Sequence, residues 1–200
     1  MPDFGEIAGI VALTACPIYV HDILRGAARP NRATWWIITL VGCLIATSYW
    51  GAGGRAAIWI ALTYIVSPFV IAVLSVKYGD SQWQALDRLC CLGGVISVGM
   101  WWITSSALAA LSISIVVDLL GLLPTFVKAY SKPLTESKIA WGIAALASFI
   151  NILAIERWSF AIAAYPLYLL ATNGLMVGII LYPRRSSFSN SRDSDRSADA

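Results

Sequence analysis

Residues 122–141, LLPTFVKAYSKPLTESKIAW, connect two apolar segments through a short basic loop. The first segment contains Pro124, the loop begins near Lys128, and the second segment begins next to Trp141. Proline is tolerated inside membrane helices, and tryptophan is enriched where such helices meet water. The stretch is therefore typical of two membrane-spanning helices joined on one side of a bilayer.

The same pattern stands near the other end of the chain, in residues 15–36, ACPIYVHDILRGAARPNRATWW. A proline again lies in the apolar run, basic residues follow, and a tryptophan opens the next run. Two copies of one pattern indicate an internal repeat. The aligned pairs are Pro17 with Pro124, Tyr19 with Phe126, Val20 with Val127, His21 with Lys128, Trp35 with Trp141 and Arg55 with Arg157, and Arg29–Pro30 matches Lys132–Pro133 if the loop is given a gap.

The composition of the chain also indicates a membrane protein. Of its 200 residues, 58% are hydrophobic and only 12% are charged, whereas a soluble domain carries about a quarter charged residues. Continuous apolar runs without alternation favour helices of about 20 residues over a β-barrel. Seven spans are predicted, at residues 7–24, 35–50, 56–76, 86–103, 108–128, 139–155 and 159–182.

Basic residues predict the orientation of these spans. Twelve of the fourteen Lys and Arg fall in the loops after spans one, three and five or in the tail, and the other two are Arg55 and Arg157. The positive-inside rule then places the N-terminus outside and the C-terminus in the cytoplasm, in the plasma (inner) membrane. The first span lacks a basic leader and is expected to be retained.

The predicted fold class is all-α integral membrane, with two three-helix bundles joined by a linker helix (3+1+3). The domains are residues 1–78 for the first bundle, 79–106 for the linker region, 107–183 for the second bundle and 184–200 for a disordered Ser-rich tail. Because the linker adds one span, both bundles have the same orientation. Parallel repeats of this kind place a transport pathway at their interface.

The segment LLPTFVKAYSKPLTES resembles the start of a three-helix bundle in the SWEET sugar facilitators and the wider PQ-loop superfamily. That resemblance implies seven helices and transport by alternating access. The chain departs from the family pattern because Pro17 and Pro124 are followed by Ile18 and Thr125 rather than glutamine. The family's paired asparagines are represented by Asn173 alone, so the solute need not be a sugar.

Polar residues inside the spans are the candidate pathway residues. Asp118 lies near the middle of the fifth span, and a carboxyl group at that depth is expected to face a cavity or a partner. The cystinosin-like exporters, which are similar, use an aspartate on this helix for proton coupling; the alternative is a structural hydrogen bond. Asn173 could bind a solute or bond to Asp118. Asn151, Thr63 and Ser67 complete the predicted pathway.

Several further residues receive structural assignments from the sequence. Pro17 and Pro124 are predicted to be paired hinges, with a static kink as the alternative. Glu136 is predicted to cap the sixth span. The tryptophans, Trp35 and Trp141 among them, are assigned to interfacial belts.

The predicted function is a facilitator or proton-coupled carrier of a small polar solute, with a sugar as one candidate. The alternative is a non-transporting receptor or assembly subunit, whose partner would contact the cytoplasmic loops or the tail. A lipid-directed enzyme is the third reading, but no catalytic motif stands in the sequence, so an enzyme is not predicted. The expected partners are the solute and the lipid bilayer. We expect no binding of nucleic acid, cofactor or metal, and a homo-oligomer is left open.

Overall fold

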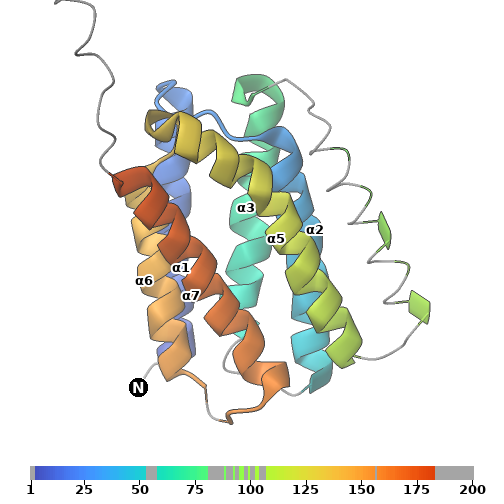
Figure 1. The fold of residues 1–200 in the computed structure, drawn as a ribbon. Coiled ribbons are helices and arrows are strands. Elements are labelled where there is room, and N and C mark those ends of the chain that lie inside the picture. The colour runs from blue at the N-terminus through green and yellow to red at the C-terminus, as the bar shows by residue number, and fades with distance from the viewer. Residues whose placement is uncertain are drawn as a thin grey trace, which may run out of the picture.

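The computed structural model describes residues 3–52, 58–80, 107–155 and 157–182, together with positions 88, 92, 95, 96, 99, 102 and 103. Its named elements are all helical, which confirms the predicted all-α class. They are α1 (Phe4–Leu24), α2 (Arg32–Ala52), α3 (Ile58–Tyr78), α5 (Ala107–Ser131), the 3-10 turn η1 (Pro133–Thr135), α6 (Lys138–Leu153) and α7 (Phe160–Leu181) (Figure 1). The predicted fourth span at 86–103 and the tail at 184–200 lie mostly or wholly outside the described residues.

Three of these helices are long and apolar enough to cross a membrane. They are α1, the Leu111–Ser131 part of α5, and α7. Shorter apolar segments occupy Arg32–Ala46 in α2, Leu62–Tyr78 in α3 and Lys138–Leu153 in α6. Large apolar side chains on the outside of the bundle are exposed, as lipid-facing side chains would be. These features indicate a membrane protein.

Short polar side chains and a glycine set the ends of the helices. The Asn31 side chain accepts a hydrogen bond from the Thr34 amide at 3.0 Å, which caps the start of α2. The Ser137 hydroxyl accepts one from the Ala140 amide at 3.4 Å and caps α6 in the same way. After α1, Gly26 takes a φ of 73°, a left-handed conformation that turns the chain out of the helix.

The six described helices pack as a closed ring. Helix α1 contacts α3 and α6, α2 contacts α3 and α5, and α7 contacts α5 and α6. The order around the ring is therefore α1, α3, α2, α5, α7, α6 and back to α1. This pairing is unchanged when α1 is exchanged with α5, α2 with α6 and α3 with α7. The loops after α1 and α5 lie at the same end of the bundle, the upper end in Figure 1.

The repeat seen in the sequence has the same helix boundaries in both copies. Aligning Pro17 with Pro124 also aligns the last residues of α1 and α5. Aligning Trp35 with Trp141 aligns the first residues of α2 and α6, together with the caps described above. Aligning Arg55 with Arg157 aligns the first residues of α3 and α7. The two halves thus share one local plan.

Two pairs of equivalent residues contact each other. The rings of Trp35 and Trp141 lie 6.1 Å apart between centroids, and the Arg29 amide donates to the Thr135 carbonyl oxygen at 3.0 Å. A residue that contacts its own equivalent lies beside a two-fold axis. The two halves therefore meet about a pseudo-two-fold axis that passes through these contacts.

This register corrects one alignment made from the sequence. Pairing Arg29–Pro30 with Lys132–Pro133 does not follow the register of α2 and α6, which pairs Arg29 with Thr135 and Pro30 with Glu136 and leaves a gap of one residue earlier in the loop. The helix caps fix the loop register, so counting back from the tryptophans gives the correct equivalence. Glu136 then has no acidic counterpart in the first half.

Close helix packing at Gly42 gives a first testable prediction. A Cβ atom there would lie 2.4 Å from the Tyr64 carbonyl oxygen, so Gly42→Ala must push α2 away from α3. We expect a loss of about 1–3 kcal/mol, measured as a lower melting temperature in detergent. Gly142→Ala on α6 is the matched control, since nothing lies within 4 Å of its added Cβ. Equal melting of the two variants would contradict this packing.

Candidate functional site

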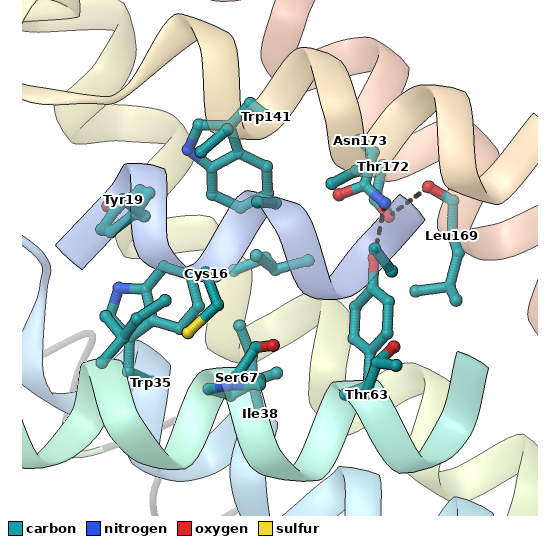
Figure 2. Close-up of a pocket in the computed structure, with 18 of the residues that line it drawn as sticks. Cys16, Tyr19, Trp35, Ile38, Thr63, Ser67, Trp141, Leu169, Thr172 and Asn173 are labelled. Carbon is teal, nitrogen blue, oxygen red and sulfur yellow. Dashed lines mark hydrogen bonds between the residues drawn. The ribbon is translucent and has the colours of Figure 1, made fainter. Parts of the chain in front are cut away.

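A cavity lies inside the ring, and all six described helices contribute to its wall. Its volume is about 80 Å³, which is room for a small group of water molecules. Figure 2 shows polar side chains at one end of the cavity and aromatic side chains at the other. The lining residues used below are Cys16, Tyr19, Trp35, Thr63, Tyr64, Ser67, Asp118, Trp141, Thr172 and Asn173.

Asn173 joins three helices at the polar end of the cavity. Its side-chain nitrogen donates to the Tyr64 hydroxyl at 2.6 Å (Figure 2) and to the Ser148 hydroxyl at 2.9 Å. These partners lie on α3 and α6, while Asn173 itself lies on α7. Both amide hydrogens are therefore in use, and the side-chain carbonyl oxygen is left as an acceptor.

Asp118 is the formally charged residue among those that line the cavity. It lies on α5, only 3% of its surface is exposed, and one carboxylate oxygen accepts a hydrogen bond from the Tyr168 hydroxyl at 2.8 Å. The ring of Tyr168 stacks on Tyr165, with centroids 6.2 Å apart. The structure thus pairs Asp118 with Tyr168 and not with Asn173, so these two groups face the cavity with separate partners.

The other predicted pathway residues divide into two groups. Thr63 and Ser67 on α3 line the cavity with Asp118 and Asn173. Asn151 does not line it, although it is fully buried. It lies seven residues after Ala144, a lining residue of the same helix, and so about 10 Å further along α6. Among the described residues its side-chain nitrogen and oxygen have no hydrogen-bond partner.

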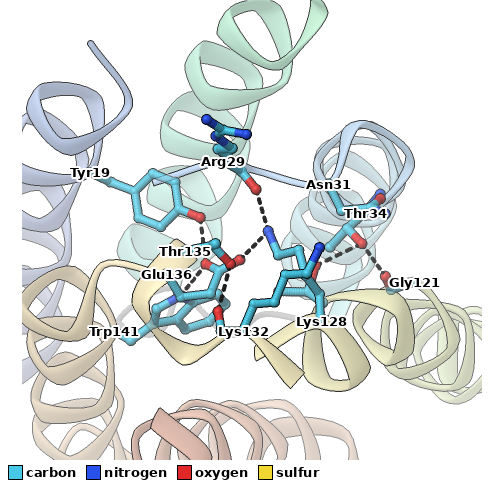
Figure 3. A network of polar contacts seen from close by, with 11 residues as sticks. Tyr19, Arg29, Asn31, Thr34, Gly121, Lys128, Lys132, Thr135, Glu136 and Trp141 are labelled. Carbon is cyan, nitrogen blue, oxygen red and sulfur yellow. Dashed lines mark hydrogen bonds and ion pairs between the residues drawn. The ribbon is translucent and has the colours of Figure 1, made fainter. Parts of the chain in front are cut away.

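A buried carboxylate closes the aromatic end of the cavity. Glu136 accepts hydrogen bonds from the Tyr19 hydroxyl at 2.6 Å and from the Trp141 indole at 3.0 Å (Figure 3). Its second oxygen pairs with the Lys128 ammonium at 2.5 Å. The Glu136 side chain is fully buried, and Lys128 is only 12% exposed. Because Tyr19 and Trp141 also line the cavity, this pair lies directly behind its wall.

Further hydrogen bonds tie the two halves together at this end. The Lys128 ammonium also donates to the Arg29 carbonyl oxygen, and the Ser137 hydroxyl donates to the Asp22 carboxylate. We call Tyr19, Arg29, Lys128, Glu136 and Trp141 the Glu136 cluster. It combines residues of both halves, so its contacts join the two halves across the pseudo-two-fold axis at this end of the ring.

Two assignments made from the sequence are wrong at this end. Glu136 does not cap α6, because Ser137 is the cap and Glu136 points into the buried cluster. Trp35 and Trp141 are not interfacial, since each is only 7% exposed and both line the cavity. The sequence contained a signal for the cluster, because Glu136 stands where the first repeat has Pro30. A charged residue found in only one copy of a repeat indicates that the two copies differ in function at that position.

Pro17 and Pro124, the predicted hinges, lie inside continuous helices. Pro17 follows the lining residue Cys16 in α1, and Pro124 lies two residues after the lining residue Leu122 in α5. Each proline removes one backbone donor from its helix beside the cavity. They therefore occupy equivalent places close to the aromatic end.

The site combines a carboxylate, an amide and several aromatic rings inside a helical ring. Among the described residues that line the cavity there is no Lys, Arg or His. Such a set can bind a small polar molecule by hydrogen bonds, charge and ring faces. Comparison with protein-family models, with curated proteins and with solved structures found no match for the chain.

Proposed function

We propose that the chain is a membrane carrier, either a facilitator or a proton-coupled carrier, that moves a small polar solute by alternating access. The observation that carries this proposal is the cavity inside the ring, to which all six described helices contribute and which Asp118 and Asn173 line. The proposed topology is two parallel three-helix bundles joined by a linker helix in residues 79–106. The N-terminus is outside and the C-terminus cytoplasmic, with the basic loops on the cytoplasmic side.

The energetics of the bilayer support this reading. Polar and ionisable groups inside membrane helices are costly, and they mark pathways for solutes or protons. Asp118 and Asn173 both face the same cavity, and they come from α5 and α7, which are neighbours in the ring. The polar groups therefore gather at one central place, as a solute site requires.

The pseudo-two-fold axis supports the mechanism. In the proposed cycle the two halves rock about this axis, and the cavity opens alternately to each side. The described conformation is closed at the basic loops by the Glu136 cluster. Opening there requires Tyr19 and Arg29 of the first half to separate from Glu136 and Lys128 of the second. Pro17 and Pro124 lie where each helix would bend.

Solute uptake into proteoliposomes tests the proposal. We expect Asp118→Asn to reduce the initial rate about tenfold or more, because a solute or proton loses its charged partner. If the carrier is proton-coupled, this variant also loses its response to a pH gradient. Asp3→Asn is the matched control, since Asp3 caps α1 at the surface and asparagine caps equally well. No flux of any solute at any pH would contradict the carrier function and favour a receptor.

A further inference from the structure

We propose that the solute is a small organic cation whose ammonium group pairs with Asp118; this inference rests on the carrier function proposed above. Three independent properties of the cavity wall lead to it. They are its net charge, the direction of its free hydrogen-bonding groups, and its aromatic rings.

The charge of the wall favours a cation. Asp118 brings a carboxylate, and no basic residue stands among the described residues of the wall to balance it. The ammonium of Lys128, which lies behind Tyr19 and Trp141, is already paired with Glu136. Within low-dielectric surroundings an unbalanced carboxylate attracts a positive ligand and repels an anion. A carboxylate or phosphate solute is therefore disfavoured.

Asn173 and Thr172 offer hydrogen-bond acceptors to the cavity. Both hydrogens of the Asn173 amide are used by Tyr64 and Ser148, so its oxygen remains. The Thr172 hydroxyl donates to the backbone carbonyl oxygens of Tyr168 and Leu169, so the lone pairs of its oxygen remain available to accept a hydrogen bond. An ammonium group has donors and no acceptor, so it can use both of these acceptors. The hydroxyls of Tyr64, which accepts from Asn173, and of Ser67 are donors on the same wall, so the hydrogen-bonding groups admit an ammonium group and the charge of Asp118 selects it.

Aromatic rings form the opposite end of the cavity. Tyr19 and Trp35 lie 5.1 Å apart between ring centroids, and Trp35 lies 6.1 Å from Trp141. Ring faces attract cations through their quadrupoles, and tryptophan is the strongest of them. The carbon atoms of an amine would also find apolar contacts there, while the small volume of about 80 Å³ limits the size of the solute.

The test compares amines with neutral molecules of the same shape, using the full chain purified in detergent. The pairs are ethanolamine with ethylene glycol and propan-1-amine with propan-1-ol. We expect the amine of each pair to raise the melting temperature in a concentration-dependent way, because it binds only the folded protein. The neutral twin should leave the melting temperature unchanged. Equal shifts for amine and twin, or no shift with either amine, would overturn the inference.

Two variants assign the effect to the carboxylate. Asp118→Asn should weaken amine binding about tenfold or more, whereas Asp3→Asn should bind as the wild type does. If Asp118→Asn fails to fold, the comparison of charged and neutral twins on the wild type decides alone. Binding that survives unchanged in a folded Asp118→Asn protein would place the amine elsewhere and overturn the inference.

Uptake in proteoliposomes separates this inference from the function on which it rests. Flux of a neutral sugar or polyol that amines do not inhibit would keep the carrier and remove the cation specificity. Saturable amine binding that depends on Asp118, without flux of any solute, would keep the cation site and remove the carrier.

Discussion

Replacing Glu136 by glutamine should open the cavity toward the basic loops, so that Cys16 reacts about tenfold or more faster with a thiol reagent from that side. Glutamine keeps the size of the side chain and loses its charge. Lys128 is then left buried without a counter-charge, which costs about 3–5 kcal/mol when one partner of a buried pair is removed. An open conformation places Lys128 in water and avoids this cost. Cys16 lines the cavity and reports the opening without knowledge of the solute.

The labelling experiment uses Cys16 as the single cysteine, with the other three cysteines changed to serine. A membrane-impermeant, positively charged methanethiosulfonate is added to sealed vesicles of either orientation. The rate should rise only when the basic loops face the reagent. Lys138→Gln is the control, because Lys138 is an exposed basic residue beside the same loop. A folded Glu136→Gln protein with unchanged labelling from both sides would show that the cluster does not close the cavity.

A disulfide across the pseudo-two-fold axis should stop transport completely. The Arg29 amide and the Thr135 carbonyl oxygen are 3.0 Å apart, and residues so close are within reach of a disulfide. In a cysteine-free background, Arg29→Cys with Thr135→Cys would lock the two halves together at this end. After oxidation, flux should fall to the level of protein-free vesicles, and a reducing agent should restore it.

A second cysteine pair controls for oxidation itself. The Thr135 amide donates to the Lys132 carbonyl oxygen at 3.0 Å, and both residues belong to the second half. Lys132→Cys with Thr135→Cys can therefore cross-link without joining the halves, and transport should continue. Full flux through the oxidised Arg29–Thr135 pair would show that the halves need not separate there, and it would refute alternating access at this end.

The sequence predicted the helices and the repeat because both depend on local patterns. Pro17, Pro124 and the paired tryptophans marked equivalent places, and charges marked the loops. Asp118 and Asn173 could be singled out because a polar group inside an apolar span must face away from lipid. These two residues do line the cavity, together with Thr63 and Ser67.

The partners of these residues could not be predicted, because they depend on the order of helices around the ring. Lipid and protein interior both accept apolar residues, so the apolar residues of a helix such as α7 do not reveal which helices lie beside it. For the same reason tryptophans at helix ends fitted an interfacial belt, although Trp35 and Trp141 are buried. The bond between Asp118 and Tyr168 and the burial of Glu136 likewise follow only from the tertiary arrangement.

The closed ring has a consequence for biogenesis. Asn173 lies in the last helix, yet one of its partners, Tyr64, lies in the first half of the chain. In the proposed topology α1, α2 and α3 enter the bilayer before α7 is made, so the Tyr64 hydroxyl is first exposed to lipid or to the translocation machinery. The Tyr19 hydroxyl likewise lacks its hydrogen-bond acceptor until Glu136 is made. The first half is therefore an intermediate that depends on the second half for its polar contacts. The quality control of membrane insertion must tolerate its unpaired hydroxyl groups until the second half is inserted.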